Sequence, residues 1–215
     1  MSTPPRDVRV CVFGDSFVAG VGDPKALGWV GRVAARTPSS TGVALTMYSL
    51  GVRGQSTEDV VVRMPLEISP RFARGDEHGV VLAVGVADAF AAVAVARSAA
   101  TLEFGLRSTG LRRLVVGPPP VGPDDLRRRI AELDGAYAEL CARLDVPYVS
   151  TYGPLAEHGP WLDQRFADGV HPGQAGYGML AYVVLHGGWY DWLGVPVPAR
   201  EADARRRRRA PGATG

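Results

Sequence analysis

The chain of 215 residues has only two cysteines and no asparagine at all. Cys11 and Cys141 by themselves cannot form a disulfide framework or a zinc site, and so little cysteine is typical of a reducing, cytoplasmic environment. An excess of charge of one sign is also missing. The 24 basic and 22 acidic side chains leave a formal net charge of +2, which argues against a protein that binds nucleic acid through its charge.

The chain also lacks recognisable membrane and export signals. The amino-terminal segment, Met1 to Arg9, is polar and has no apolar core of the kind that marks a secretory signal. The longest apolar stretch, 79–96, reaches the length of a membrane span, but Gly85 and Asp88 interrupt it. We interpret it as a buried strand that runs into a helix, and we expect no membrane partner and a cytoplasmic location.

The composition predicts one folded domain followed by a tail. With 46% hydrophobic and 21% charged residues, the chain can bury a sizeable core without disulfides or metal. We assign this domain to residues 1–195. From Pro196 the composition changes to Pro, Ala and acidic residues and then to the run Arg205 to Arg209. Residues 196–215 are predicted to form a disordered, arginine-rich tail, and a polyanion-binding arm is the alternative.

Short β-rich runs alternate with segments of helical periodicity. The continuous apolar run Val80 to Val84 is typical of a strand buried on both faces, as in a parallel sheet. The predicted strands are 8–13, 43–50, 79–84, 111–116 and 146–150, and the predicted helices are 28–37, 57–69, 88–108, 123–144 and 173–186. This alternation predicts an α/β fold, a doubly wound three-layer α/β/α sandwich with its ligand site at the carboxyl ends of the strands.

The loop after the first predicted strand contains a candidate nucleophile. Gly14-Asp15-Ser16 follows that strand directly, so Ser16 should be exposed at the ligand-binding edge, and Gly14 lets the backbone turn sharply. A nucleophilic serine needs a base, and the base needs a group that orients it. Of the four histidines, only His171 has a carboxylate three residues before it, in Asp168-Gly169-Val170-His171. Asp168 can accept a hydrogen bond from one imidazole nitrogen, which leaves the other free to take the serine proton.

Glycines follow the second and third predicted strands. The second strand leads into Gly51-Val52-Arg53-Gly54-Gln55, and the third leads into Gly85-Val86-Ala87-Asp88. Glycine allows a backbone to approach a substrate closely, so these turns are candidates for donating hydrogen bonds to an oxyanion. An ordinary strand-to-helix turn is the alternative for each.

In this order, the segments resemble those of the SGNH, or GDSL, hydrolase superfamily from about Val8 to Leu185. The resemblance implies a flavodoxin-like five-stranded parallel sheet and no metal or organic cofactor. It implies that Ser16 is the nucleophile and that its backbone N–H is one oxyanion donor, with Asp168 as orienting group and His171 as base. Gly54 matches the oxyanion glycine, and Gly51 is the competing alignment. The segment Pro118 to Pro120 matches a rim of the family's cleft.

One position departs from the family pattern. The third family block reads Gly-x-Asn-Asp, and its Asn side chain donates to the oxyanion, but this chain has Ala87 there. Loss of one such donor typically costs about 2.7–4 kcal/mol, or roughly 100- to 1,000-fold in rate. Because the Ser16 and Gly54 amides remain, we expect weakened rather than abolished catalysis. A replacement donor (Gln55 is nearest in sequence), an activated acyl substrate, drift toward binding and an introduced change are competing explanations.

The predicted function is therefore a serine esterase or acylhydrolase that works through an acyl-enzyme on Ser16. An acyltransferase that uses an activated acyl donor and a catalytically weakened binding protein are the alternatives. The expected partner is a small-molecule ester or acyl compound. We expect no nucleic-acid partner, because such a role would depend on Arg205 to Arg209 alone. Tyr152, Trp161 and Phe166 either line an apolar acyl pocket or pack over the sheet edge.

Overall fold

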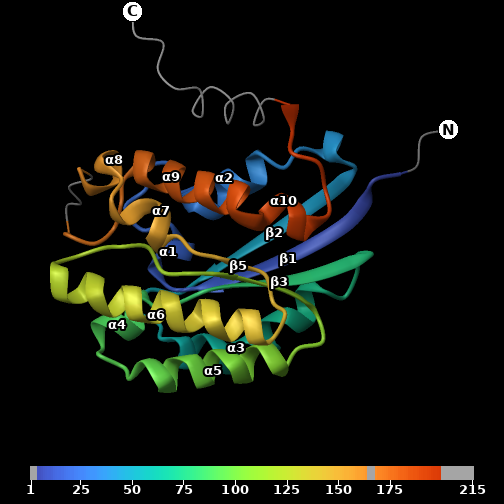
Figure 1. Ribbon diagram of the computed structural model, residues 1–215. Coiled ribbons are helices and arrows are strands. Elements are labelled where there is room, and N and C mark those ends of the chain that lie inside the picture. Colours follow the sequence, from blue (N-terminus) through green and yellow to red (C-terminus); the bar gives the residue numbers. More distant parts are fainter. Residues whose placement is uncertain (1–3, 164–167, 200–215) are drawn as a thin grey trace, which may run out of the picture.

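The computed structural model describes residues 4–163 and 168–199 and has three layers, with helices on both faces of a parallel sheet (Figure 1). The sheet has five strands in the order β2-β1-β3-β4-β5, and every neighbouring pair is parallel. This flavodoxin-like order confirms the predicted fold class. The strands are β1 (Arg6–Gly14), β2 (Val43–Gly51), β3 (Glu77–Ala83), β4 (Arg112–Val116) and β5 (Tyr148–Val149).

The two central strands, β1 and β3, form the middle of the core. Val10, Val12 and Val81 are completely buried, and Val12 pairs with Val81 in the sheet register. Strands covered on both faces need apolar side chains at every position, which explains their continuous hydrophobic runs. The chain order reverses between β1 and β3, and such a switch point leaves a crevice beyond the carboxyl ends of the strands.

The helices divide between the two faces of the sheet. In Figure 1, α3, α4, α5 and α6 lie below the sheet, and α2, α9 and α10 lie above it. The lower helices are α3 (Thr57–Arg71), α4 (Val86–Phe90), α5 (Val95–Arg107) and α6 (Asp124–Arg143). The upper ones are α2 (Gly28–Ala35), α9 (Gln174–Val184) and α10 (Tyr190–Leu193). The remaining short elements are α1 (Ser16–Ala19), α7 (Tyr152–Ala156), α8 (Gly159–Leu162), the 3-10 turn Ser39–Thr41 and the π-helical turn Leu185–Trp189.

The continuous helix predicted for 88–108 is wrong. The structure has two helices there, α4 and α5, with a turn between them in which Ala92 adopts a left-handed φ of 50°. The break allows the Asp88 side chain to point into the core, where it accepts a hydrogen bond of 2.8 Å from Ser98 on α5. A buried carboxylate needs such partners, and a straight helix could not bring Asp88 and Ser98 face to face.

Several predicted features lie outside the described residues. These are Phe166 and the tail from Arg200 onward, including Arg205 to Arg209. Within the described ranges, no helix combines the length and the hydropathy that crossing a bilayer requires.

Candidate active site

Ser16 lies at the switch point, at the first position of α1 directly after β1. Asp15 caps this short helix, because its carboxylate accepts a hydrogen bond of 2.9 Å from the Phe17 amide. Only glycine fits at position 14, since a Cβ there would come within 2.2 Å of the Ala83 carbonyl oxygen on β3. The close contact between the ends of β1 and β3 thus fixes where the chain turns and presents Ser16.

The structure brings together the three side chains that the sequence singles out. His171 Nε2 lies 2.7 Å from Ser16 Oγ, and His171 Nδ1 lies 2.5 Å from Asp168 Oδ2. The other Asp168 oxygen accepts backbone N–H bonds from Val170 (3.0 Å) and His171 (2.8 Å). Burial disfavours a charged Asp168, but the hydrogen bonds from His171 and these amides outweigh it and hold the pKa of Asp168 well below its usual value.

The ionised carboxylate determines the tautomer of the neutral imidazole. A carboxylate can only accept, so Nδ1 of His171 must carry the proton that it shares with Asp168. Nε2 is then left as an acceptor facing the Ser16 hydroxyl. This is the protonation state in which the ring can take the serine proton.

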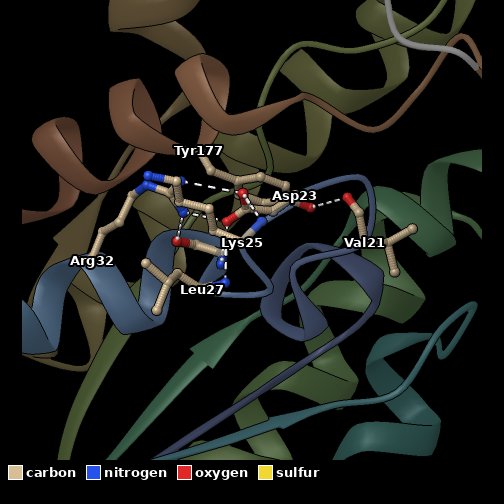
Figure 2. Close-up of polar contacts among 7 residues, drawn as sticks. Val21, Asp23, Lys25, Leu27, Arg32 and Tyr177 are labelled. Carbon is tan, nitrogen blue, oxygen red and sulfur yellow. Dashed lines mark hydrogen bonds and ion pairs between the residues drawn. The ribbon is translucent and has the colours of Figure 1, made fainter.

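A buried ion pair stabilises the loop between α1 and α2, which lies behind His171. Figure 2 shows Asp23 surrounded by donors: the backbone amides of Lys25 (3.1 Å), Leu27 (3.2 Å) and Gly28 (2.9 Å) and the guanidinium of Arg32. The Asp23 side chain is fully buried. Chiefly because of the Arg32 hydrogen bond, the pKa of Asp23 is lowered to about 2, so the carboxylate is charged at neutral pH.

The same loop packs against the segment that carries His171. A Cβ on Gly22 would lie 3.0 Å from the Pro172 carbonyl oxygen and 3.3 Å from His171 Cβ. The hydroxyl of Tyr177, on α9, donates a hydrogen bond of 2.7 Å to the Val21 carbonyl (Figure 2). On its other side, the His171 ring lies 5.3 Å from the Phe17 ring, measured between centroids. The backbone of His171 is therefore held between α1 and a loop with satisfied hydrogen bonds.

Opposite the histidine, a tight turn brings Gly54 to the same crevice. The turn is closed by a bond from the Gln55 amide to the Val52 carbonyl (3.3 Å) and is attached to β1 by a bond from the Val52 amide to the Gly14 carbonyl (3.0 Å). Gly54 has a φ of 75°, which favours glycine. Gly51 has a different environment: a Cβ there would lie 2.1 Å from the Ala19 amide nitrogen, so Gly51 packs against α1.

An open cleft of about 580 Å³ lies between the two sides. Its described lining residues are Asp15, Ser16, Arg53, Gly54, Val86, Ala87, Phe90, Ala91, Val170 and His171. Ala87, at the expected Asn position, presents only a methyl group to it. Burial raises the pKa of Asp15 to about 6, although the backbone amides of Phe17 and Ala87 donate to its carboxylate. The Ala87 segment therefore braces Asp15 and contributes no side-chain donor to the cleft.

Gln55, the nearest replacement donor in the sequence, points elsewhere. Its side-chain oxygen accepts a hydrogen bond of 2.5 Å from Arg63, which also donates to the carbonyls of Gly14 and Leu50. Gln55 is not among the described residues that line the cleft. It helps Arg63 to join α3 to the ends of β1 and β2.

The segment Pro118 to Pro120 and Trp161 pack in the interior. The three prolines are buried, and two of them line a small cavity of about 20 Å³ beside Phe17 and Trp29. Trp161 is also buried and donates from Nε1 to the Pro120 carbonyl (2.8 Å). The expected rim is therefore part of the core behind the cleft, and Trp161 is a packing residue.

A buried polar network that no sequence motif indicated lies beneath the Gly54 turn and helix α4. Asp88 accepts bonds from both the amide and the hydroxyl of Thr57, each 2.9 Å long. The Tyr137 hydroxyl lies 2.6 Å from Ser98 Oγ and 3.1 Å from Thr57 Oγ1. These bonds connect the start of α3, which follows Gly54, to α4, which carries Ala87. In the sequence, this network is indicated only by Asp88, a charged residue within an apolar stretch.

Comparison with known proteins decides the family. The model of the GDSL-like lipase/acylhydrolase family matches residues 12–179. The chain belongs to this family. It is thus a GDSL-type serine ester hydrolase, and the match covers every segment that the resemblance used. Among curated protein sequences, none matches this GDSL hydrolase.

Solved structures share the fold of this GDSL hydrolase. A lipase/acylhydrolase from Enterococcus faecalis superposes with a TM-score of 0.69 at 24% identity, over 88% of this chain and 98% of that one. A lipolytic G-D-S-L family protein from Veillonella parvula gives 0.68 at 22%, over 83% and 97%. A catalytic mutant of an acetylxylan esterase from Geobacillus stearothermophilus gives 0.70 at 18%, over 89% and 98%. At these identities the likeness is one of fold.

Proposed function

We propose that this GDSL hydrolase cleaves a small-molecule ester through an acyl-enzyme on Ser16. The observation that carries the proposal is the unbroken hydrogen-bond chain from Asp168 through His171 to Ser16, at the edge of an open cleft. Each group has the partner that its role requires. A cytoplasmic location and the absence of a cofactor stay predictions.

The proposed reaction has two halves. His171 Nε2 takes the Ser16 proton while Oγ attacks the ester carbonyl, and the ring then protonates the leaving alcohol. In the second half, His171 takes a proton from water, which attacks the acyl-enzyme, and returns it to Ser16 as the acid departs. Asp168 holds the tautomer and stabilises the charged imidazolium throughout.

The amides of Ser16 and Gly54 are the proposed oxyanion donors, and the third donor of the family is missing at Ala87. Gly54 is favoured over Gly51 because Gly54 lines the cleft, whereas Gly51 packs against α1. Two donors instead of three should lower the rate by about 100- to 1,000-fold relative to a complete oxyanion hole.

Hydrolysis of short- and medium-chain 4-nitrophenyl esters tests both the role of Ser16 as nucleophile and the missing oxyanion donor at Ala87. Ser16→Ala should abolish turnover, and Ala87→Asn should raise kcat by up to about 100-fold by restoring a donor. Full activity in Ser16→Ala would overturn the proposed mechanism. Activity that depends on Ser16 but does not rise in Ala87→Asn would overturn only the depleted oxyanion hole and would indicate a replacement donor.

Acyl transfer is the second candidate function, and Ala87 favours it. An activated acyl donor, such as a thioester, needs less oxyanion stabilisation than an alkyl ester. The test is the partitioning of the acyl group between water and added alcohols or amines. If added alcohols or amines never receive the acyl group, the acyltransferase hypothesis is rejected and hydrolysis is the supported function.

A further inference from the structure

Arg53 is the one side chain among the described cleft-lining residues that carries a full positive charge at every physiological pH. It directly precedes Gly54 and occupies the first central position of the turn from Val52 to Gln55. The bond that closes this turn and the bond that attaches it to β1 fix the Arg53 backbone next to Gly54, the proposed oxyanion donor. The guanidinium is therefore tethered within the cleft region.

Arg53 differs from the arginines that stabilise this fold. Arg32 is paired with the buried Asp23, and Arg63 donates to Glu67, Gln55 and two backbone carbonyls. Arg53 is exposed, and among the described residues it has no hydrogen-bond or ion-pair partner. An arginine whose five donors meet no acceptor in the described part of the chain is available to a ligand.

Neither of the two carboxylates near the cleft forms a described ion pair with Arg53. Asp15 is almost fully buried and accepts hydrogen bonds from backbone amides, and Asp168 accepts hydrogen bonds from His171 and two backbone amides. The rest of the lining is largely apolar, with Phe90, Val86 and Val170 among its members. The described part of the cleft therefore offers a substrate an apolar surface, the Ser16 hydroxyl and one cation that has no partner there.

We propose that Arg53 binds a carboxylate carried by the substrate, so that this GDSL hydrolase prefers negatively charged esters to neutral esters of the same size. A guanidinium matches the planar shape, the two oxygens and the single charge of a carboxylate. This inference rests on the proposed ester hydrolysis and adds a substrate class to it.

The test compares two matched esters. One is the 4-nitrophenyl hemiester of adipic acid, and the other replaces its free carboxylate with an isopropyl group. We expect kcat/KM to favour the charged ester by about tenfold. Arg53→Met should reduce this ratio to about one, mainly by raising KM for the charged ester, and Arg53→Lys should keep part of it. Increasing salt should also reduce the preference of the wild type, because the pair is exposed.

Arg74→Met is the matched control. Arg74 is another exposed arginine, but it precedes β3 at the opposite edge of the sheet, so its loss changes the net charge equally and should leave the ratio unchanged. The acetyl ester of 4-hydroxybenzoate carries the carboxylate on its leaving group, and phenyl acetate is its neutral counterpart. Comparing this pair with the adipate pair shows which side of the ester Arg53 contacts.

Two results would overturn the inference. One is equal kcat/KM for the two matched esters in the wild type, and the other is a ratio that Arg53→Met leaves unchanged. In both cases the proposed function survives if Ser16→Ala abolishes turnover. If the wild type hydrolyses no ester of either kind, the proposed function fails and this inference fails with it.

Discussion

The histidine side and the oxyanion side of the cleft differ in how completely their polar groups are paired. On the histidine side, Asp168 and Asp23 both accept several hydrogen bonds, and the loop around Asp23 packs against the backbone of His171. On the oxyanion side, Ala87 presents no donor to the cleft, and Arg53 has no partner among the described residues.

This difference separates positioning from recognition. A base must keep its geometry within fractions of an ångström, so the polar groups around it are paired. Unpaired groups that face a cleft can be satisfied only by a ligand. We therefore expect substitutions on the histidine side to lower kcat or stability, and those around Arg53 to change the choice of substrate.

The largest effect should come from Asp168→Asn. An amide can present its NH2 group to His171 Nδ1 and so stabilise the wrong tautomer, in which Nε2 carries a proton and cannot act as base. We expect kcat for 4-nitrophenyl acetate to fall by about 1,000- to 10,000-fold. Asp163→Asn, an exposed change nearby in the sequence, is the control. A loss below tenfold in Asp168→Asn would mean that the backbone contacts alone hold the imidazole.

The second effect concerns the buried pair. Asp23→Ala leaves Arg32 and three backbone amides without their acceptor and should lower the free energy of unfolding by about 3–5 kcal/mol. Because folding lowers the pKa of Asp23 to about 2, its stabilisation is present above its ordinary value of about 4 and is lost as the pH falls toward 2.

Urea unfolding of the wild type and of Asp23→Ala at pH 7 and at pH 2.5 measures both effects. The difference between the two proteins should shrink at the lower pH. Arg97→Ala removes an exposed ion pair with Glu58 and should cost less than about 1 kcal/mol. Equal losses in the two variants would contradict the contrast between buried and exposed pairing.

The smallest effect should come from the network beneath the oxyanion side. Tyr137→Phe removes one hydroxyl, while Thr57 and Ser98 keep their bonds to Asp88. We expect a loss of about 1–2 kcal/mol in the free energy of unfolding. Tyr152→Phe, at a half-buried tyrosine, is the control and should change it by less than about 0.5 kcal/mol. If Tyr137→Phe lowers the free energy of unfolding no more than Tyr152→Phe does, the bonds from Thr57 and Ser98 to Asp88 are enough to stabilise the network without the Tyr137 hydroxyl.

Local patterns predicted the parts of the fold that depend on near neighbours in the chain. Continuous apolar runs identified the buried strands, and the periodicity from Leu126 to Leu144 identified α6 almost to its ends. Patterns failed at 88–108, because the stretch is helical in composition and only the contact of Asp88 with Ser98 and Thr57 requires a break. No local pattern showed that Gln55 pairs with Arg63 on α3, which leaves Gln55 outside the described cleft lining.

Residue types and short spacings specify the succession of strands and loops along the chain, the local pairing of Asp168 with His171, and the lack of a side-chain donor at position 87. Each of these depends on residue type or on a spacing of a few residues. Long-range packing specifies that His171 reaches Ser16 from 155 positions away, that the loop of Asp23 packs behind it, and that Arg53 faces the cleft with no partner among the described residues. Those contacts form between segments that are far apart in the chain when the carboxyl ends of the parallel strands come together. Local sequence patterns therefore cannot predict them.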